Sequence, residues 1–295
     1  MRSLPRAIPA LITPFTRRGE LDIEAHRRNV SLMWDLELRG LLIAGSTGEG
    51  PYLESGERRR LIAAARGDSP RSFILCGVHA ETVRTATAAM REAADGGADA
   101  VLVATPTTLV RHRPDLIEKY FMDVAKAAPL PVLLYSVPKV TGVELAEESV
   151  VTLSSHPGVV GMKDSGGDPI RASRLVEAAP SEFALYAGAT AAVSLSVAVG
   201  AHGAITASAN YAPKLLRDTV IAARKSLRTA ESLQSNLTVL SGTVERHGVP
   251  AVKYAAGRAG FSPGYSRAPL ISPSPDIRRR VRRALDDAGV TQEPQ

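Results

Sequence analysis

Eight short apolar runs, each separated from the next by a stretch long enough for one helix, constrain the fold of this chain more than any other feature. The runs are continuous rather than alternating, as expected for strands of a parallel sheet that is covered on both faces. They occupy residues 7–12, 40–44, 73–77, 100–104, 132–135, 159–162, 183–187 and 203–206.

The stretches between these runs have helical patterns. They cover residues 23–38, 55–65, 82–96, 114–127, 146–154, 169–178, 191–199 and 213–223. Pro114, Pro169 and Pro213 stand at first-turn positions, where proline favours a helix start. Eight strand–helix units with right-handed crossovers predict a closed (β/α)8 TIM barrel over residues 1–224. A doubly wound sheet also suits alternating elements, but it usually has fewer strands, and no G-x-G-x-x-G motif follows a strand here.

No strand pattern follows residue 224. Residues 226–247, 249–259 and 275–288 are predicted to form three helices. We therefore expect residues 225–295 to be a C-terminal helical extension packed on the barrel, with a frayed tail over residues 290–295.

The charge of the chain is +6, and arginine supplies 29 of its 36 basic residues, most densely at residues 278–283. A nucleic-acid site would need a binding motif or stacking aromatics beside such a basic run. Aromatics are only 4% and no such motif occurs, so we expect a solvated helix there and no nucleic-acid partner. The lone Cys76 and the lack of a signal or membrane-spanning segment predict a cytoplasmic protein without a membrane partner.

Lys163 is the most informative candidate for chemistry. Active sites of such barrels lie at the carboxyl ends of the strands, and Lys163 directly follows the sixth run. Burial disfavours the charged ammonium form of a lysine, and a neutral amine can attack a ketone to form an imine. The alternative is a structural lysine paired with Asp164 or Glu49.

Tyr135, Ser46 and Thr47 follow or end other strands at the same face. A phenol at Tyr135 could shuttle a proton during imine formation and bond cleavage, and the alternative is a core tyrosine. The backbone N–H groups of Ser46 and Thr47 suit a carboxylate, and their hydroxyls could relay a proton from Tyr135. The alternative for this glycine-flanked stretch is an ordinary turn.

The six histidines show no metal-ligand spacing, so we expect no metal site and mostly surface or satisfied roles for them. His112 is the exception. Together with Arg111 and Arg113 it follows the fourth run, where the cluster could bind a distal carboxylate of the substrate rather than form a solvated loop.

Three motifs in this order and spacing resemble the dihydrodipicolinate synthase / N-acetylneuraminate lyase superfamily across residues 7–270. They are Gly-Ser-Thr-Gly-Glu at 45–49, Leu-Tyr-Ser-Val-Pro at 134–138 followed by Thr-Gly at 141–142, and Gly-Met-Lys-Asp-Ser at 161–165. The resemblance implies a pyruvate Schiff base on Lys163 without a cofactor, with Tyr135 as proton shuttle and Ser46 and Thr47 on the carboxylate.

The same resemblance implies further site residues and an assembly. A backbone carbonyl near Ile205 would face the imine, and Gly188 and Ser165, which follow the seventh and sixth runs, would line the substrate site. Members of the superfamily are commonly homotetramers built as dimers of dimers. The partners would be a small 2-keto acid and an aldehyde.

Within the superfamily, residues 135–138, 151–168 and 267–270 look most like 4-hydroxy-2-oxoglutarate aldolases, which would give pyruvate and glyoxylate. The alternatives are a dihydrodipicolinate synthase and a 2-keto-3-deoxy sugar acid aldolase or dehydratase. A non-catalytic keto-acid-binding barrel is the alternative from a different class.

Two departures from the superfamily pattern bear on the substrate. Synthases have an arginine before the Thr-Gly pair, where it holds the aldehyde's carboxylate, but this chain has Val140 there, preceded by Lys139. The superfamily usually has two tyrosines after the fourth strand, one of which reaches into the neighbouring subunit's site, but this chain has Thr107 and Thr108 there. We expect Thr108 to offer a hydroxyl to the substrate site, although it is a weaker acid than a phenol.

Overall fold

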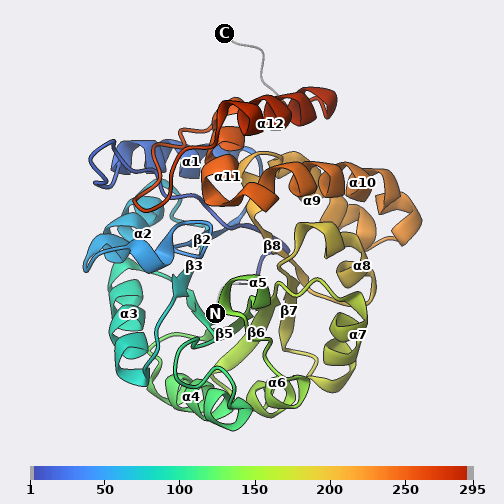
Figure 1. The fold of residues 1–295 in the computed structure, drawn as a ribbon. Helices are drawn as coiled ribbons and strands as arrows, with labels where there is room; N and C mark the ends of the chain where they lie inside the picture. The colour runs from blue at the N-terminus through green and yellow to red at the C-terminus, as the bar shows by residue number, and fades with distance from the viewer. Residues whose placement is uncertain (1–2, 291–295) are drawn as a thin grey trace.

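The computed structural model describes residues 3–290, and its eight parallel strands form one barrel (Figure 1). The strands β2 to β8 pair in sequence order, and β1 pairs with β8. A parallel bridge between Ala10 and Leu42, with a 2.9 Å hydrogen bond from Leu11 N to Leu42 O, joins β1 to β2 and closes the ring. The predicted (β/α)8 fold is confirmed.

All eight predicted runs contain a strand. The strands are β1 Ala7–Pro9, β2 Gly40–Ile43, β3 Phe73–Val78, β4 Ala100–Ala104, β5 Val132–Ser136, β6 Val159–Asp164, β7 Ala184–Ala187 and β8 Gly203–Thr206. Two strands differ most from the prediction: β1 ends at Pro9 rather than at residue 12, and β6 continues through Lys163 to Asp164. Lys163 is therefore part of the sheet, and its position is fixed by backbone pairing on both sides.

The helices between the strands follow the predicted ranges closely. They are α1 Ile23–Asp35, α2 Glu57–Asp68, α3 Val83–Gly96, α4 Pro114–Ala127, α6 Glu147–Ser154, α7 Pro169–Ala178, α8 Val193–Ala198 and α9 Pro213–Ala223. A short additional helix, α5 (Pro138–Thr141), was not predicted; it follows β5 and lies over the central opening in Figure 1. Gly142 ends it with a φ of 69°, a conformation that glycine adopts without strain.

Side chains of the strands form two apolar layers because alternate residues point to opposite faces of the sheet. The inner layer fills the barrel and includes Leu133, Tyr135, Tyr186 and Ile205. The outer layer packs between the strands and the helices. Tyr186 directs its hydroxyl to Pro5 O at 2.8 Å, ahead of β1, and so helps to fill the amino end of the barrel.

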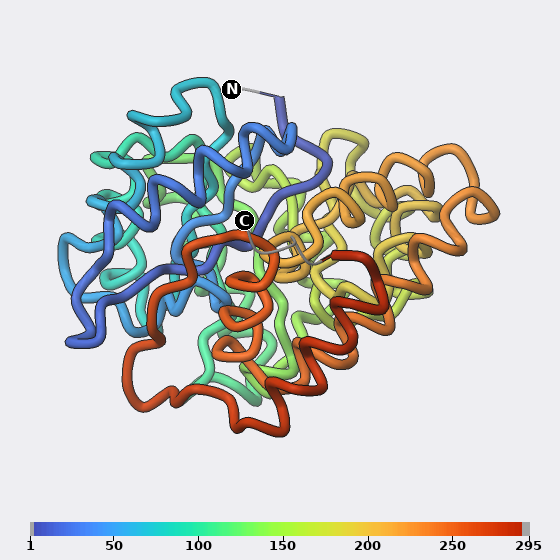
Figure 2. Tube along the Cα trace, turned by 90° about the horizontal axis from the view of Figure 1, so that it is seen from above, coloured from blue at the N-terminus to red at the C-terminus, as the bar shows by residue number. Residues whose placement is uncertain are grey.

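Beyond the barrel, the three predicted C-terminal helices are α10 Leu227–Val244, α11 Gly248–Arg258 and α12 Pro275–Asp287. The 3-10 turn η4 (Glu245–His247) joins α10 to α11. Figures 1 and 2 show α12 lying against α10 and α11, while α10 packs on α8 and α9. These contacts fit the predicted extension; the frayed tail predicted beyond residue 290 lies outside the described residues.

The arginine-rich helix α12 is amphipathic. Val281 and Leu285 are fully buried, whereas Arg279 and Arg280 are exposed and pair with Asp276 at 3.3 and 3.0 Å. The charged residues thus form the solvent face of the helix. Within residues 3–290, no helix is long and apolar enough to cross a membrane.

Candidate active site

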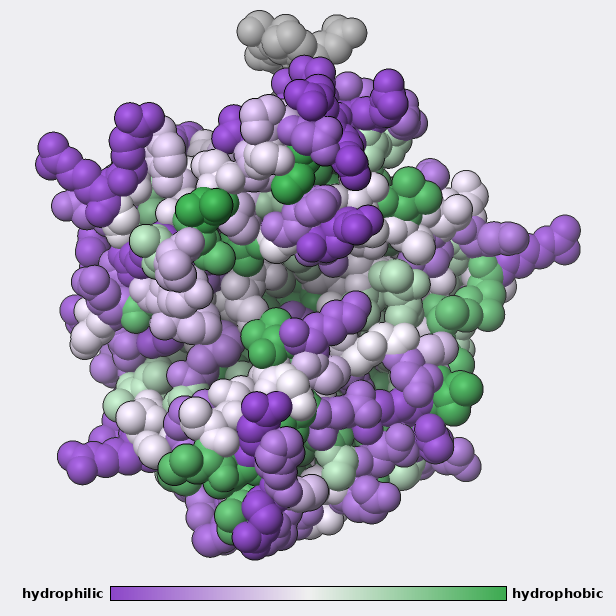
Figure 3. Space-filling model, viewed as in Figure 1, coloured by the Kyte–Doolittle hydropathy of each residue, from purple (hydrophilic) through white to green (hydrophobic). Residues whose placement is uncertain are grey.

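Lys163 and Tyr135 lie side by side at the carboxyl ends of β6 and β5. The strand register pairs these two residues, so their side chains share the inner face of the barrel. The Lys163 Nζ is 3.5 Å from the Tyr135 hydroxyl and 4.6 Å from the centre of its ring. Only 5% of Lys163 and 3% of Tyr135 is exposed. Figure 3 shows this face of the molecule hollowed at its centre.

Both carboxylates that a structural Lys163 was expected to pair with are bound elsewhere. Asp164 accepts from Arg171 Nε at 2.7 Å, and Glu49 pairs with Lys253 Nζ at 2.5 Å. Among residues 3–290, Lys163 forms no ion pair. The amine is thus held beside a phenol and is not neutralised by a carboxylate, which contradicts the alternative reading as a paired structural lysine.

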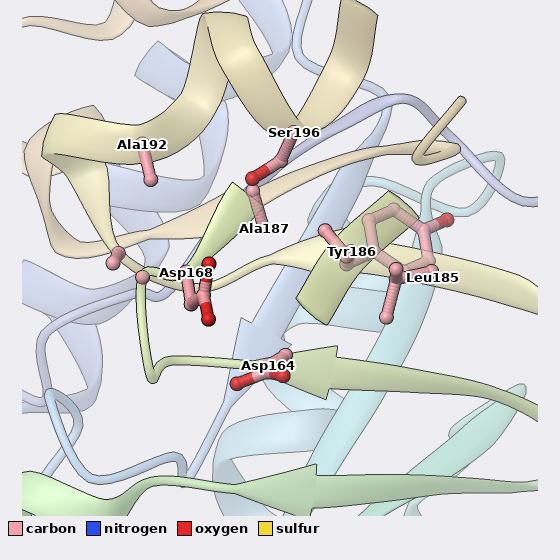
Figure 4. A pocket seen from close by; sticks show the side chains of 10 residues that line it. Asp164, Asp168, Leu185, Tyr186, Ala187, Ala192 and Ser196 are labelled. Carbon is pink, nitrogen blue, oxygen red and sulfur yellow. The ribbon is translucent and has the colours of Figure 1, made fainter. Parts of the chain in front are cut away.

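Asp164 points away from Lys163, to the helix side of the sheet. Figure 4 shows it at the end of β6, across a small cavity from Ala192 and Ser196. This cavity holds only about 10 Å³, which is space for a water molecule but not for a keto acid. The role of Asp164 is therefore to fix the strand end: its Oδ1 accepts from Gly166 N at 2.8 Å, and Arg171 holds its other oxygen.

Replacing Arg171 by alanine is expected to destabilise the fold strongly. The side chains of Arg171 and Asp164 are 5% and 10% exposed, so the substitution would leave a buried carboxylate without its cation. Loss of one partner of such a pair costs about 3–5 kcal/mol in the free energy of unfolding, to be measured by urea denaturation.

Arg174→Ala is the matched control, because Arg174 lies on the same helix and pairs with Glu147 at 3.4 Å but is 59% exposed. Exposed pairs contribute at most about 1 kcal/mol. Equal effects of the two substitutions would show that the Asp164–Arg171 pair does not stabilise the end of β6.

The loop of Ser46 and Thr47 is a tight turn that leaves backbone donors free. Glu49 N donates to Ser46 O at 3.1 Å and Gly50 N to Gly45 O at 3.0 Å. The N–H groups of Ser46 and Thr47 donate to no acceptor within the part of the chain described. Adjacent N–H groups without a partner suit an anion such as a carboxylate. Position 50 must be glycine, since a Cβ there would lie 2.0 Å from Ala44 O.

Glu49 ties this loop to the C-terminal extension. Besides its pair with Lys253, its Oε2 accepts from Arg267 N at 2.8 Å. Burial lowers the pKa of Lys253 to about 8, although its pairing with Glu49 opposes that shift. Lys253 also donates to Tyr265 O at 2.6 Å. The partners of this second buried amine are therefore Glu49 and Tyr265, and not the Lys163–Tyr135 pair.

Three other expected site residues surround Lys163. Gly188 N donates to Asp164 O at 2.6 Å, and a Cβ at position 188 would lie 2.9 Å from Lys163 Cε and 2.1 Å from Ser165 Oγ. Only glycine therefore fits beside the lysine stem. Ser165 is buried and continues the strand pairing through Ser136 O at 2.9 Å. Ile205 lies fully buried in the inner layer with Tyr135.

The structure does not bring Thr108 to this group. The exposed Glu81 accepts hydrogen bonds from the N–H and hydroxyl of both Thr107 and Thr108, with N–O distances of 3.0–3.1 Å. Although burial tends to raise the pKa of Glu81, these hydrogen bonds lower it below its ordinary value. The Thr108 hydroxyl is thus committed to Glu81 and exposed.

Arg111, His112 and Arg113 also lie apart from Lys163. Arg111 is exposed and lines a surface cavity of about 280 Å³ with His112 and Glu144, next to Gly142. Arg113 forms a surface pair with Asp115 at 2.6 Å. Binding of a distal carboxylate by Arg111 therefore stays a prediction, and it would have to occur at the rim above α5.

His79 is a residue of the barrel mouth that the sequence analysis assigned to a surface or satisfied role. It directly follows β3, its Nε2 lies 3.2 Å from Ser46 Oγ, and its ring meets that of Tyr135 edge-on at 6.5 Å. Burial, and then the charges of Arg58 and Lys163, lower the pKa of His79 to about 4. The rule that function gathers at strand ends would have found it.

Glu245 is a second residue missed from the sequence. It lies in η4 of the extension, and one of its oxygens accepts from Thr190 and Tyr211, both at 2.8 Å. Burial raises its pKa, and the nearby charge of Lys163 opposes this shift. The extension therefore contributes an acidic group within electrostatic reach of Lys163, on the β7–β8 side. No local sequence pattern marks it, because its partners follow β7 and β8.

Comparisons with known proteins agree with this geometry. The model of the dihydrodipicolinate synthetase family matches residues 3–288. The 4-hydroxy-tetrahydrodipicolinate synthases of Thiobacillus denitrificans and Nitrosomonas europaea are 34% and 30% identical to the chain, each covering at least 96% of both proteins. The crystal structure of chloride-inhibited dihydrodipicolinate synthase from Acinetobacter baumannii, complexed with pyruvate, superposes with a TM-score of 0.92. It is 29% identical, covering 98% of this chain and all of that one.

Proposed function

We propose that this chain, which belongs to the dihydrodipicolinate synthetase family, uses Lys163 to form a Schiff base with pyruvate. The chain is a lyase of the superfamily that acts on pyruvate through such a base. The observation that carries the assignment to Lys163 is its burial beside the Tyr135 hydroxyl at 3.5 Å without a carboxylate partner in residues 3–290.

The residues at the barrel mouth suit each step of this chemistry. Lys163 Nζ attacks C2 of the keto acid, and Tyr135 gives a proton to the hydroxide that leaves as water. The free N–H groups of Ser46 and Thr47 hold the substrate carboxylate. The imine then accepts the electron pair when the C3–C4 bond breaks, while Tyr135 takes the proton of the 4-hydroxyl. Condensation runs through the same steps in reverse.

For the aldehyde, we propose glyoxylate, released with pyruvate from 4-hydroxy-2-oxoglutarate. Val140 supports this reading: it stands on α5 where a synthase has its carboxylate-binding arginine, and it is 68% exposed at the rim. No guanidinium is therefore offered at that position to the distal carboxylate of aspartate semialdehyde, whereas the carboxylate of glyoxylate is bonded directly to the aldehyde carbon and lies closer to the reacting atoms.

Condensation of pyruvate with aspartate semialdehyde is the second candidate. The names of the two synthases reported above favour it over the cleavage of 4-hydroxy-2-oxoglutarate. In that case Arg111, whose guanidinium lies beside Gly142 at the end of α5, is a candidate to replace the missing arginine.

We place the protein in the cytoplasm as a homotetramer, a dimer of dimers, whose partners are a small 2-keto acid and an aldehyde. The exposed Leu109, 97% accessible in the single chain, is an apolar position in the connection between β4 and α4 that a neighbouring subunit would cover.

Trapping with borohydride in the presence of pyruvate tests the proposal. We expect a mass increase of one reduced pyruvate per chain, located on the peptide that contains Lys163. Glyoxylate and aspartate semialdehyde are then supplied separately, and consumption of pyruvate is followed by NMR. Turnover with aspartate semialdehyde alone would reject the first candidate aldehyde, and absence of any adduct under conditions that trap a family member would reject pyruvate as the keto acid.

A further inference from the structure

We propose that His79 directs the hydroxyl proton of Ser46 toward the Lys163–Tyr135 pair and thereby supports proton transfer there. This inference rests on the proposed function, since it assigns a role in the same imine chemistry. His79 acts through Ser46, so it is a positioning residue and not a group that touches the substrate.

The contact between His79 and Ser46 carries the proposal. The 3.2 Å separation of Nε2 from Ser46 Oγ is a hydrogen bond, and it joins the strand end of β3 to the loop after β2. On the other side, the His79 ring meets the Tyr135 ring edge-on, with 78° between their planes. Ser46 thus has an imidazole on one side, in the same group of side chains as the phenol that lies against Lys163.

The second nitrogen of His79 indicates which atom carries the proton. Nδ1 is buried and has no hydrogen-bond partner in the described part of the chain. A proton on Nδ1 would be a buried donor without an acceptor, which costs about 1–3 kcal/mol. Buried acceptors without a donor are more common than such donors. The proton therefore belongs on Nε2, which donates to Ser46 Oγ.

This direction of the bond determines what Ser46 can do. Because its oxygen accepts from His79, its own hydroxyl proton must point elsewhere. When Tyr135 has given its proton to the departing hydroxide, a phenolate remains. A Ser46 hydroxyl that points toward that oxygen stabilises the phenolate by donating a hydrogen bond to it, until solvent or the substrate returns the proton to Tyr135.

Burial, and then the charges around His79, keep the imidazole neutral. Arg58 from α2 and Lys163 from β6 both lower its pKa, and the ring of Tyr135 from β5 meets it edge-on. Arg58 is itself anchored by Gly77 O at 3.3 Å and by Glu92 at 3.1 Å. No carboxylate in the described residues bonds to His79 to favour its protonation. A neutral imidazole has a single N–H group. Because Nδ1 is buried without a partner in the described residues, that group is Nε2–H, which donates to Ser46.

Exchange of the methyl protons of pyruvate with D2O measures this role without any aldehyde. The imine must lose and regain a C3 proton, so the exchange rate reports proton transfer at the site. We expect His79→Phe to lower this rate by up to about a hundredfold, because a misplaced catalytic group costs that much. His79→Gln, whose side-chain amide can place an N–H near Nε2, should restore most of the rate.

Two further readouts separate positioning from a structural effect. Borohydride trapping by His79→Phe should still give the Lys163 adduct, and the exchange rate of His79→Gln should keep the wild-type pH profile above pH 5. His26→Phe is the control: His26 is also buried, with Nε2 3.1 Å from Leu61 O, an unpartnered Nδ1 and a pKa lowered to about 4. Its loss should affect stability but not the exchange rate of the folded enzyme.

The proposal is overturned if His79→Phe exchanges as fast as the wild type, or if His79→Gln is as slow as His79→Phe. The latter would mean that the imidazole itself accepts and releases the proton. If the wild type neither traps pyruvate nor exchanges its protons, the proposed function fails instead.

Discussion

Lys163→Ala will form no adduct with pyruvate and will lose turnover by at least about four orders of magnitude, the scale seen when a covalent nucleophile is removed. The physical reason is that the alanine cannot form the imine, and no other amine lies beside Tyr135 within the described residues. The measurement is intact mass after borohydride trapping, together with the rate of pyruvate consumption or release.

The fold should survive this substitution. Lys163 forms no ion pair among residues 3–290, so its removal leaves no buried carboxylate without a partner. Lys163→Arg is the matched variant, because it keeps a positive charge near Tyr135 but cannot form an imine. Retained activity in Lys163→Arg would mean that the charge, and not the nucleophile, is what the reaction requires.

Lys253 provides the internal check on this result. Like Lys163, Lys253 is buried. Its pKa is lowered to about 8, and it pairs with Glu49 and donates to Tyr265 O. An adduct that persists in Lys163→Ala and maps to Lys253 would show that a low pKa determines reactivity here more than position does. Loss of the adduct in Lys163→Ala would show that the imine forms on Lys163, at the carboxyl end of β6.

Much of this arrangement follows from local sequence. Continuous apolar runs identify parallel strands, and consecutive strands of a barrel are neighbours, so the adjacency of Lys163 and Tyr135 could be predicted without a structure. The helix α5 could not, since its four residues are too few to show a helical period. Its position over the mouth matters because it presents Val140.

The residues that the sequence did not reveal depend on partners distant in the chain. His79 bonds to a serine 33 residues earlier, and Glu245 to groups 55 and 34 residues earlier. Thr108 follows the fourth strand as predicted, but Glu81 on the adjacent β3–α3 connection captures its hydroxyl. The sequence thus predicts which residues follow a strand end, but it does not predict which acceptor their side chains will bond to.

Tyr135→Phe is expected to slow both imine formation and bond cleavage by about 10²- to 10⁴-fold, the usual contribution of a general acid–base group. The substitution removes only the hydroxyl that lies 3.5 Å from Lys163 Nζ and keeps the ring whose centre lies 4.6 Å from the same nitrogen. The rate of adduct formation in timed borohydride quenches reports the first step, and aldehyde-dependent turnover reports the second.

Tyr186→Phe is the matched control for that substitution. Tyr186 is the partner of Lys163 on the other neighbouring strand, β7, but its hydroxyl is directed to Pro5 O at 2.8 Å, at the opposite end of the barrel. Its loss leaves a backbone carbonyl unpaired and should cost about 1–3 kcal/mol of stability without slowing either chemical step. If Tyr135→Phe retains wild-type rates, the proton must pass through Thr47 or water instead. If both tyrosine variants are slowed equally, the effect comes from packing inside the barrel, and the phenol of Tyr135 has no special role.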